Sequence, residues 1–526
     1  MRKFLFLAIA ALALVTVGSA GARSASQRAH LFVGFSKSPG AAQRALVTQL
    51  GGTVRFSFPQ VKALAIDLSS EKVGTLARQA GVAYVEQDPE RVPLGLDTEQ
   101  LTPSLSNGLY GLVTTNAVDA QSAGYTGAGV KACVADTGLD TTHPDIASNF
   151  AGGYNVFDGT NDVDVFDLGV ETTETHATHV SGTLLGVDNS VGILGVAPNA
   201  SLYEARVLGT QPDGSVSGST SQVMAGVQWL ADQGCKVINM SLGGGSRSRT
   251  EENLYKQVTA GGTLIVVAAG NESAHKLSFP AGYGVVLSVG AVDVNNAHAS
   301  FSNTGHGLDL SAPGVDVLSS VPAGQGRNSS VTVGSTTYSA LGMEFAGTTS
   351  ASGIAGTIVD CGLAVSASDC PASVSGNIAL IQRGSVTFAQ KVESAMAAGA
   401  TGAVIYNNVA GNFNGTLGSA TTSGGDPWIP AVSVSDTDGA ALKTQVGSST
   451  TLVNAPSSWD TYSGTSMATP HVAGVAALVL GKNPALSPTQ VESILESTAT
   501  DLGRSGYDST FGYGLVNATA ALAATP

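Results

Sequence analysis

Charged and aromatic residues are scarce in this sequence. Only 12 % of its 526 residues are charged, about half the usual share of roughly 25 % in a soluble domain, and 6 % are aromatic. With 24 basic residues against 39 acidic ones, the formal net charge is −15, which disfavours a phosphate-binding surface. So few aromatic side chains also provide no stacking platform for bases. We therefore expect no nucleic-acid partner.

Long apolar runs are scarce as well, and the one that stands out lies at the N-terminus. Arg2 and Lys3 precede an apolar run over residues 4–17, and the sequence A-G-A at 20–22 offers a cleavage site. This order is typical of a signal peptide, and the run is shorter than the roughly 20 residues that a membrane span needs. We expect residues 1–22 to be removed and the mature protein to be secreted, extracellular and without a membrane partner.

Cysteine is the next scarce residue, with four in the whole chain. In an exported protein, four cysteines suggest disulfides. Cys361 and Cys370 are nine positions apart and can close a local loop, which leaves Cys133 and Cys235 as the second pair. The alternative, that the latter two are buried free thiols, stays open. No paired-cysteine or cysteine–histidine spacing indicates zinc.

The order of strand-like and helical segments divides the chain. Residues 23–104 follow the order β-α-β-β-α-β, which is typical of a ferredoxin-like α+β domain. In residues 105–325 and 456–526, apolar strands alternate with helices, which indicates a parallel sheet covered on both faces. Residues 326–455, rich in Ser, Thr, Gly and Ala, interrupt this pattern as a β-rich insert. The predicted fold class is α/β, with the α+β domain before it and the insert within it.

Polar side chains lie where the predicted strands end and the predicted helices begin. Asp136 ends a strand, and His176 and Ser466 each open a helix. Ligands bind at the carboxyl ends of parallel strands, so these residues can form a catalytic triad. In it Ser466 attacks an acyl carbon, His176 accepts and returns the proton, and Asp136 orients the imidazole. Asn271, at the end of another apolar strand, is the candidate donor to a developing oxyanion.

Two other functions have to be weighed against a hydrolase with this order of triad residues. An esterase would carry a G-x-S-x-G elbow and the chain order Ser, Asp, His, and this sequence has neither. A binding or adhesion protein would use the insert to capture ligands and would keep only a vestigial triad. The presence of all four candidate residues favours the enzyme.

These motifs resemble those of the subtilisin-like serine proteases. The family's Asp, His and Ser segments read nearly verbatim at 135–138, 176–183 and 464–471. The resemblance covers about 105–325 and 456–526. It implies a subtilisin-like catalytic domain and a serine endopeptidase that acts on protein or peptide substrates through an acyl-enzyme intermediate, with the triad and the oxyanion donor named above.

The other two parts also resemble pieces of this family. Residues 23–104 look like its inhibitory prodomain, and the insert, with I-A-L-I-Q-R-G at 378–384, looks like a protease-associated domain. The resemblance implies a zymogen whose own prodomain is its intramolecular inhibitor and is cut off within about 88–108. We expect the enzyme to be a monomer.

The resemblance further implies binding residues and a metal. An extended substrate would add a strand beside Ser241, Leu242 and Gly243. Gly270 and Gly243 would border the pocket for the residue before the cleaved bond. A loop that interrupts a helix matches the family's structural calcium site and offers the oxygen ligands that a hard cation requires; these would be Asp145, Val187, Asn189, Val191 and Ile193. His179, one helical turn after the catalytic histidine, is expected to be structural and not a zinc ligand.

Overall fold

The chain forms two compact units in the computed structural model, which describes residues 28–94, 109–413 and 415–526. The first unit ends at Gln87 and the second begins at Asp88. The predicted signal peptide lies outside the described residues. In the part of the chain that is described, no helix is long and apolar enough to cross a membrane.

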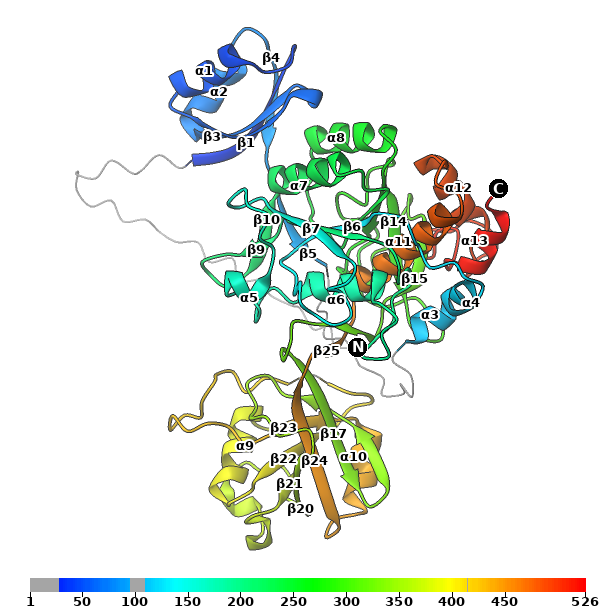
Figure 1. The fold of residues 1–526 in the computed structure, drawn as a ribbon. Coiled ribbons are helices and arrows are strands. Elements are labelled where there is room, and N and C mark those ends of the chain that lie inside the picture. Colours follow the sequence, from blue (N-terminus) through cyan, green and yellow to red (C-terminus); the bar gives the residue numbers. More distant parts are fainter. Residues whose placement is uncertain (1–27, 95–108, 414) are drawn as a thin grey trace, which may run out of the picture. The chain divides into compact units, whose positions relative to one another are not determined.

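The first unit is an antiparallel sheet covered by two helices (Figure 1). Its strand order is β2-β3-β1-β4, and alternate residues of the central strands, such as Val33 and Ile66, form its buried core. The order β-α-β-β-α-β along the chain confirms the expected ferredoxin-like domain. Its elements are β1 (Arg28–Phe35), α1 (Ala41–Gln49), β2 (Thr53–Phe58), β3 (Ala63–Ser69), α2 (Val73–Ala77) and β4 (Val82–Gln87).

The second unit is built around a seven-stranded sheet in which all neighbouring strands are parallel. The central strands are buried along their whole length, as their continuous apolar runs predicted. In spatial order the strands are β15 (Leu310–Pro313), β14 (Leu287–Val292), β13 (Leu264–Ala268), β11 (Val237–Met240), β6 (Ala132–Asp136), β8 (Leu202–Arg206) and β7 (Phe150–Asn155).

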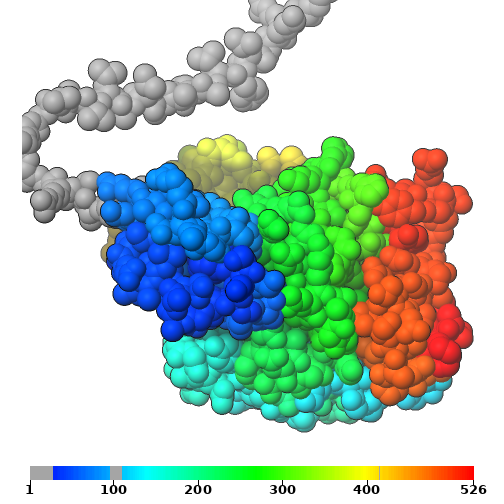
Figure 2. All heavy atoms as spheres, turned by 90° about the horizontal axis from the view of Figure 1, so that it is seen from above, coloured from blue at the N-terminus to red at the C-terminus, as the bar shows by residue number. Residues whose placement is uncertain are grey.

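Helices cover both faces of this sheet. They are α3 (Tyr110–Thr114), α4 (Ala117–Ser122), α5 (Val165–Leu168), α6 (His176–Leu185), α7 (Thr220–Asp232), α8 (Arg249–Ala260), α11 (Thr465–Lys482), α12 (Pro488–Ser497) and α13 (Ala518–Ala524). On one face, Val180 of α6 and Val475 of α11 share an apolar core with Val134 of β6. On the other face, a Cβ added to Gly226 of α7 would lie 3.0 Å from the Cβ of Ala205. The C-terminal helices gather beside α11, in orange and red (Figures 1 and 2).

The insert has its own eight-stranded sheet, in the order β18-β17-β24-β20-β21-β22-β23-β19. Along one strand Ile378 and Leu380 face one apolar cluster and Ala379 and Ile381 face another, so helices cover both sides. The elements are β17 (Gly326–Val333), β18 (Thr336–Ser339), β19 (Leu341–Gly342), β20 (Ile354–Asp360), β21 (Ile378–Gln382), α9 (Phe388–Ala397), β22 (Gly402–Tyr406), β23 (Ala431–Val434), α10 (Asp436–Lys443) and β24 (Ser449–Ser457).

Two paired strands join the insert to the α/β part. β16 (Val317–Ser320) precedes the insert, β25 (Trp459–Tyr462) follows it, and the two pair antiparallel. The chain therefore returns from the insert almost to the place where it left. This pairing delivers the start of α11, and with it the predicted nucleophile, to the edge of the parallel sheet.

The predicted prodomain and the first compact unit end at different residues. We predicted residues 23–104 as one domain, but residues from Asp88 onward belong to the second unit. There β5 (Glu90–Pro93) pairs with two strands of the α/β part. A polar, proline-containing segment becomes a strand here because partner strands receive it on both sides.

Candidate active site

The predicted acid and base are in hydrogen-bond contact. Asp136 is the last residue of β6 and is fully buried, and His176 is the first residue of α6. Nδ1 of His176 lies 2.7 Å from Oδ1 of Asp136, which also accepts from the N–H of Thr137 at 2.7 Å. Nε2 of His176 is buried and has no hydrogen-bond partner among the described residues. This arrangement holds the imidazole by one nitrogen and leaves the other for proton transfer.

The predicted nucleophile and oxyanion donor converge on one carbonyl group. Ser466 is the second residue of α11, and its N–H donates to the carbonyl oxygen of Leu94 at 3.1 Å. The side-chain amide of Asn271 donates to the same oxygen at 2.8 Å. The Oδ1 atom of Asn271 accepts from both the N–H and the hydroxyl of Thr465, each at 2.9 Å, which fixes the amide. These are the distances expected of donors that stabilise an oxyanion.

A proline in α11 helps to anchor the turn that carries the serine. Pro470 lies inside the helix and has no N–H to give to the carbonyl of Ser466, four residues earlier. That carbonyl instead accepts from Oγ of Ser241 at 2.8 Å, and Oγ of Ser466 donates to the carbonyl of Ser241 at 2.9 Å. The nucleophile is thereby tied to the segment predicted to bind substrate.

Residues of the chain itself occupy the cleft as a strand. β5 lies between β12 (Leu242–Gly243) and β10 (Val216–Ser219), antiparallel to both, in a small sheet completed by β9 (Gly209–Thr210). The N–H of Leu94 also donates to the carbonyl of Ser241 at 3.1 Å. The structure therefore brings the predicted residues Ser241, Leu242 and Gly243 together on one side of a bound strand.

The second side of this cleft was missed by the sequence reasoning. Gly218 pairs with Arg91, and Ser219 with Glu90. The four residues of β10 are too few to show strand periodicity, so no pattern could have revealed them. The only available signal is indirect: a strand bound along Ser241–Gly243 has a second edge, and another segment of the chain has to pair with it.

The side chain of Leu94 fills a pocket bordered by glycine. Leu94 is 5 % exposed, and a Cβ added to Gly243 would lie 2.7 Å from its Cδ1. Ser278 stands 3.2 Å from that same added Cβ and 2.5 Å from one added to Gly270. The nearest neighbours of such a Cβ at Gly270 are the side chains of Asn303, Ser278 and Glu272. A side chain at Gly243 would reduce the space for Leu94.

The predicted calcium ligands come together, but their side chains are engaged by the protein. Oδ2 of Asp145 accepts from the indole N–H of Trp459 at 2.7 Å and from the hydroxyl of Ser320 at 2.9 Å. The amide oxygen of Asn189 accepts from the N–H of Val191 at 2.9 Å. Calcium takes about six to eight oxygen ligands, and the five predicted residues would supply part of that set. The remaining predicted ligands, Val187 and Ile193, lie in the same loop.

Two buried histidines outside the predicted triad, His179 and His471, are held by backbone carbonyl groups. Nε2 of His179 lies 3.0 Å from the carbonyl oxygen of Val317, and the ring stacks on Tyr462 at 4.4 Å. Burial lowers the pKa of His179 to about 3. Nδ1 of His471 lies 2.8 Å from the carbonyl of Met467, and burial lowers the pKa of His471 to about 4. Both rings are therefore neutral and held by backbone groups.

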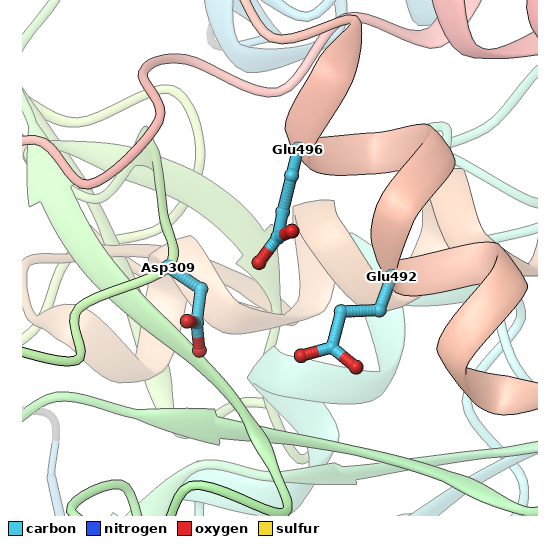
Figure 3. Close-up of side chains that lie close together, drawn as sticks. All are labelled: Asp309, Glu492 and Glu496. Carbon is cyan, nitrogen blue, oxygen red and sulfur yellow. The ribbon is translucent and has the colours of Figure 1, made fainter. Parts of the chain in front are cut away.

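Three carboxyl groups meet away from this site, which the sequence reasoning did not foresee. Asp309, Glu492 and Glu496 have carboxylate oxygens within 4.8 Å of one another (Figure 3). Burial raises the pKa of Asp309 to about 6, and burial followed by the Asp309 charge raises the pKa of each glutamate to about 7. The i, i+4 spacing of the glutamates on α12 was the available signal.

The four cysteines form two disulfides. Cys361 is bonded to Cys370, and Cys133 is bonded to Cys235 across 102 residues. These are the two expected pairs, and no free cysteine remains among the described residues. The second bond links β6, the strand that ends in Asp136, to the residue two positions before β11, so it braces the sheet beside the site.

Comparison with known families and relatives agrees with this geometry. The Subtilase family matches residues 127–360, and a PA domain matches residues 354–442. The chain is 31 % identical over 469 residues to Alkaline elastase YaB of Bacillus sp. (strain YaB), covering 88 % of this chain and 80 % of the relative. It is 29 % identical over 510 residues to Subtilisin E of Bacillus subtilis (strain 168), covering 95 % and 92 %.

Two solved structures are also similar. A psychrophilic subtilisin-like protease from the Antarctic psychrotroph Pseudoalteromonas sp. AS-11 matches with a TM-score of 0.58 at 32 % identity, covering 79 % of this chain and 97 % of that one. Fervidolysin from Fervidobacterium pennivorans, described as a keratinolytic enzyme related to subtilisin, matches with a TM-score of 0.58 at 24 % identity. The alignment covers 96 % of this chain and 63 % of fervidolysin. At this identity the match supports a shared fold and nothing more.

Proposed function

The chain belongs to the subtilase family of serine endopeptidases, and we propose that it is secreted as a zymogen whose triad is Asp136, His176 and Ser466. The mature enzyme hydrolyses peptide bonds of protein or peptide substrates. The residues of the first compact unit act as an intramolecular inhibitor until they are removed. The PA domain stays with the mature enzyme, which we expect to be a monomer.

The proposed reaction assigns each group a step. Ser466 attacks the carbonyl carbon of the bond to be cut, and Nε2 of His176 takes its proton. The oxygen that becomes negative is held by the side-chain amide of Asn271 and the N–H of Ser466. His176 then protonates the leaving amine, and water, activated by the same imidazole, releases the acyl group from Ser466. Asp136 stabilises the imidazolium in both halves.

A single observation carries this proposal: a carbonyl of the chain itself sits between the two oxyanion donors. The carbonyl of Leu94 accepts from Asn271 and from the N–H of Ser466 at 2.8 and 3.1 Å. The bond presented to the nucleophile is therefore the one between Leu94 and Gly95. It falls within the region 88–108 where we predicted processing, and cutting it separates the first unit from the enzyme.

The segment before Leu94 is held firmly enough to inhibit. Asp88 accepts from the N–H and the hydroxyl of Ser221 at 2.9 and 2.6 Å, at the start of α7, where a carboxylate is favoured by the helix dipole. The carbonyl of Pro89 accepts from the N–H of Thr220 at 2.7 Å. Together with the pairing of β5, these contacts support a product that stays in the cleft after cleavage.

The test compares the wild-type enzyme with Ser466→Ala. We expect the wild type to mature, to be labelled by a fluorophosphonate and to hydrolyse casein. The variant should remain full length and lose hydrolysis by about 10⁶-fold, a magnitude borrowed from subtilisin, itself a member of this family. Mass analysis of the released fragment should find Leu94 at its C-terminus. A wild type that neither matures nor labels would refute the proposal.

Calcium binding by Asp145, Asn189 and their loop stays a prediction from the family. No step of the proposed reaction depends on it. The measurement that decides it is the melting temperature of the mature enzyme with and without a chelator, because an ion that binds only the folded state raises that temperature. Equal melting temperatures would show that this loop does not bind calcium as a structural ion.

A further inference from the structure

The arginine three residues before Leu94 is completely buried. Arg91 is 0 % exposed, as is the side chain of its partner, Glu251. Nη2 of Arg91 lies 2.5 Å from Oε2 of Glu251, and Nε lies 3.4 Å from Oε1, so the two side chains meet through two pairs of atoms. Nη2 also donates to the carbonyl of Ser246 at 3.1 Å. A fully buried arginine is rare unless a partner compensates its charge.

The pocket around this guanidinium is built for a cation. The hydroxyl of Tyr255 donates to Oε1 of Glu251 at 3.0 Å, and that of Tyr283 donates to Oε2 at 2.8 Å. Tyr283 is held in turn by the backbone of Ser248, with contacts at 2.8 and 3.0 Å. These bonds lie entirely within the catalytic part, so they keep the carboxylate in place whether or not Arg91 is present.

The carboxylate of Glu251 faces the place where a substrate would bind, because β5 lies against it. β5 runs from Glu90 to Pro93, the residue before Leu94, and its pairing with β12 and β10 fixes which residue faces Glu251. A peptide bound in the same register would present its fourth residue before the cleaved bond at this place. Once residues up to Leu94 have left, Glu251 has lost its cation, and a substrate that supplies one restores the pair.

We propose that the mature enzyme selects substrates with arginine at the fourth residue before the cleaved bond, through Glu251. This inference rests on the proposed function and adds a substrate class to it. A guanidinium meets a carboxylate through two parallel hydrogen bonds, which an ammonium cannot do. Lysine at this position is therefore a poorer substrate than arginine, and neutral side chains leave Glu251 unpaired.

The test uses fluorogenic tetrapeptides that copy residues 91–94. The first is acetyl-Arg-Val-Pro-Leu with an aminocoumarin leaving group; the others replace arginine by lysine, leucine or citrulline. Citrulline keeps the shape of arginine without its charge. For wild-type mature enzyme we expect kcat/KM for the arginine peptide to exceed that for the citrulline peptide about 100-fold, the scale on which truncating one partner of a buried charge pair acts.

Two variants assign the preference to one residue. Glu251→Gln keeps an acceptor for the tyrosine hydroxyls and should bring the arginine-to-citrulline ratio close to one. Glu252→Gln removes the neighbouring charge, which pairs with Arg247 and Lys256 on the outer side of α8, and should keep the wild-type ratio. Ratios are measured on enzyme counted by fluorophosphonate titration, so partial misfolding of a variant does not alter them.

The outcomes separate this inference from the proposed function. If wild-type enzyme labels with fluorophosphonate and cuts all four peptides at equal kcat/KM, the arginine preference is wrong and the peptidase stands. If no peptide is cut and nothing labels, the proposed function fails first. A preference for arginine that survives in Glu251→Gln would overturn the role of Glu251.

Discussion

The two ends of the segment that lies in the cleft are held by different chemistry. At Leu94 the contacts come from backbone N–H groups, one amide and a pocket bordered by glycine. At Arg91 they come from a buried carboxylate held by two tyrosines. Backbone contacts accept any residue, whereas a buried charge accepts one kind of side chain. Under the proposed function we therefore expect the residue at the Arg91 position to restrict substrates more strongly than the residue at the Leu94 position.

The largest effect is expected from a substitution that weakens only the contacts at the Leu94 end. Asn271→Ala removes one of the two donors to the oxygen of the reacting carbonyl, so kcat should fall by about 10²–10³, the cost measured for the comparable asparagine in subtilisin, a member of this family. KM should change little, because the donor is needed most when that oxygen is negative. The measurement is steady-state hydrolysis of the arginine peptide on titrated enzyme.

The matched control for this variant is Asn295→Ala, at an exposed asparagine. It should keep the wild-type kcat. Because Asn271 also accepts from Thr465, the melting temperature is recorded for both variants. An Asn271→Ala enzyme with undiminished kcat would mean that the N–H of Ser466 suffices to hold the oxyanion.

A smaller effect is expected in the pocket that receives Leu94. Gly243→Ala places a Cβ at 2.7 Å from Cδ1 of Leu94, so peptides ending in leucine should lose about tenfold in kcat/KM relative to those ending in alanine. Gly245→Ala is the control, because a Cβ there meets nothing within 4 Å. The arginine preference at the other end should be unchanged in both variants. A simultaneous loss of that preference would show that the two ends are coupled.

The prediction of the reacting end rests on signals that are local in the sequence. Asp136, His176 and Ser466 each sit in a short motif at the end of a strand or the start of a helix. Glu251 carries no such signal: its partner is 160 residues away, and a glutamate in the first turn of an amphipathic helix has an ordinary explanation in the helix dipole. Only the structure brings the two charges together.

The elements of the fold also differ in whether local sequence or distant residues determine them. The β-α-β-β-α-β order of the first unit and the buried parallel strands of the second follow from periodicity within each segment. The strand β5 does not, because Glu90 to Pro93 contain a proline and no alternation that could be told from a linker. That segment is a strand because β12 and β10 lie on either side of it, which depends on residues far away in the chain.

The smallest expected effect compares Glu251 with a cluster of three carboxyl groups. Asp309, Glu492 and Glu496 have folded-state pKa values of about 6, 7 and 7, raised by burial and then, for the glutamates, by the charge of Asp309. In the unfolded chain they titrate near pH 4. A raised folded-state pKa contributes stability that is fully present below the unfolded value and is lost as the pH rises through the folded value. The melting temperature of the inhibited mature enzyme should therefore fall by a few degrees between pH 5 and pH 8.

Glu496→Gln should flatten this decline. It removes one of the three carboxyl groups that stay protonated to a higher pH in the folded state, and with it the repulsion between the charges of Glu496 and Glu492. Glu252→Gln is again the control: hydrogen bonds from Lys256 lower the pKa of Glu252, the opposite direction to the three clustered carboxyl groups, so the slope above pH 5 should match the wild type. The measurement is the melting temperature at half-unit steps of pH, in the presence of a chelator. If Glu496→Gln and wild type decline in parallel, the three carboxyl groups titrate as solvated acids, and a cluster of like charges at this surface costs the fold nothing.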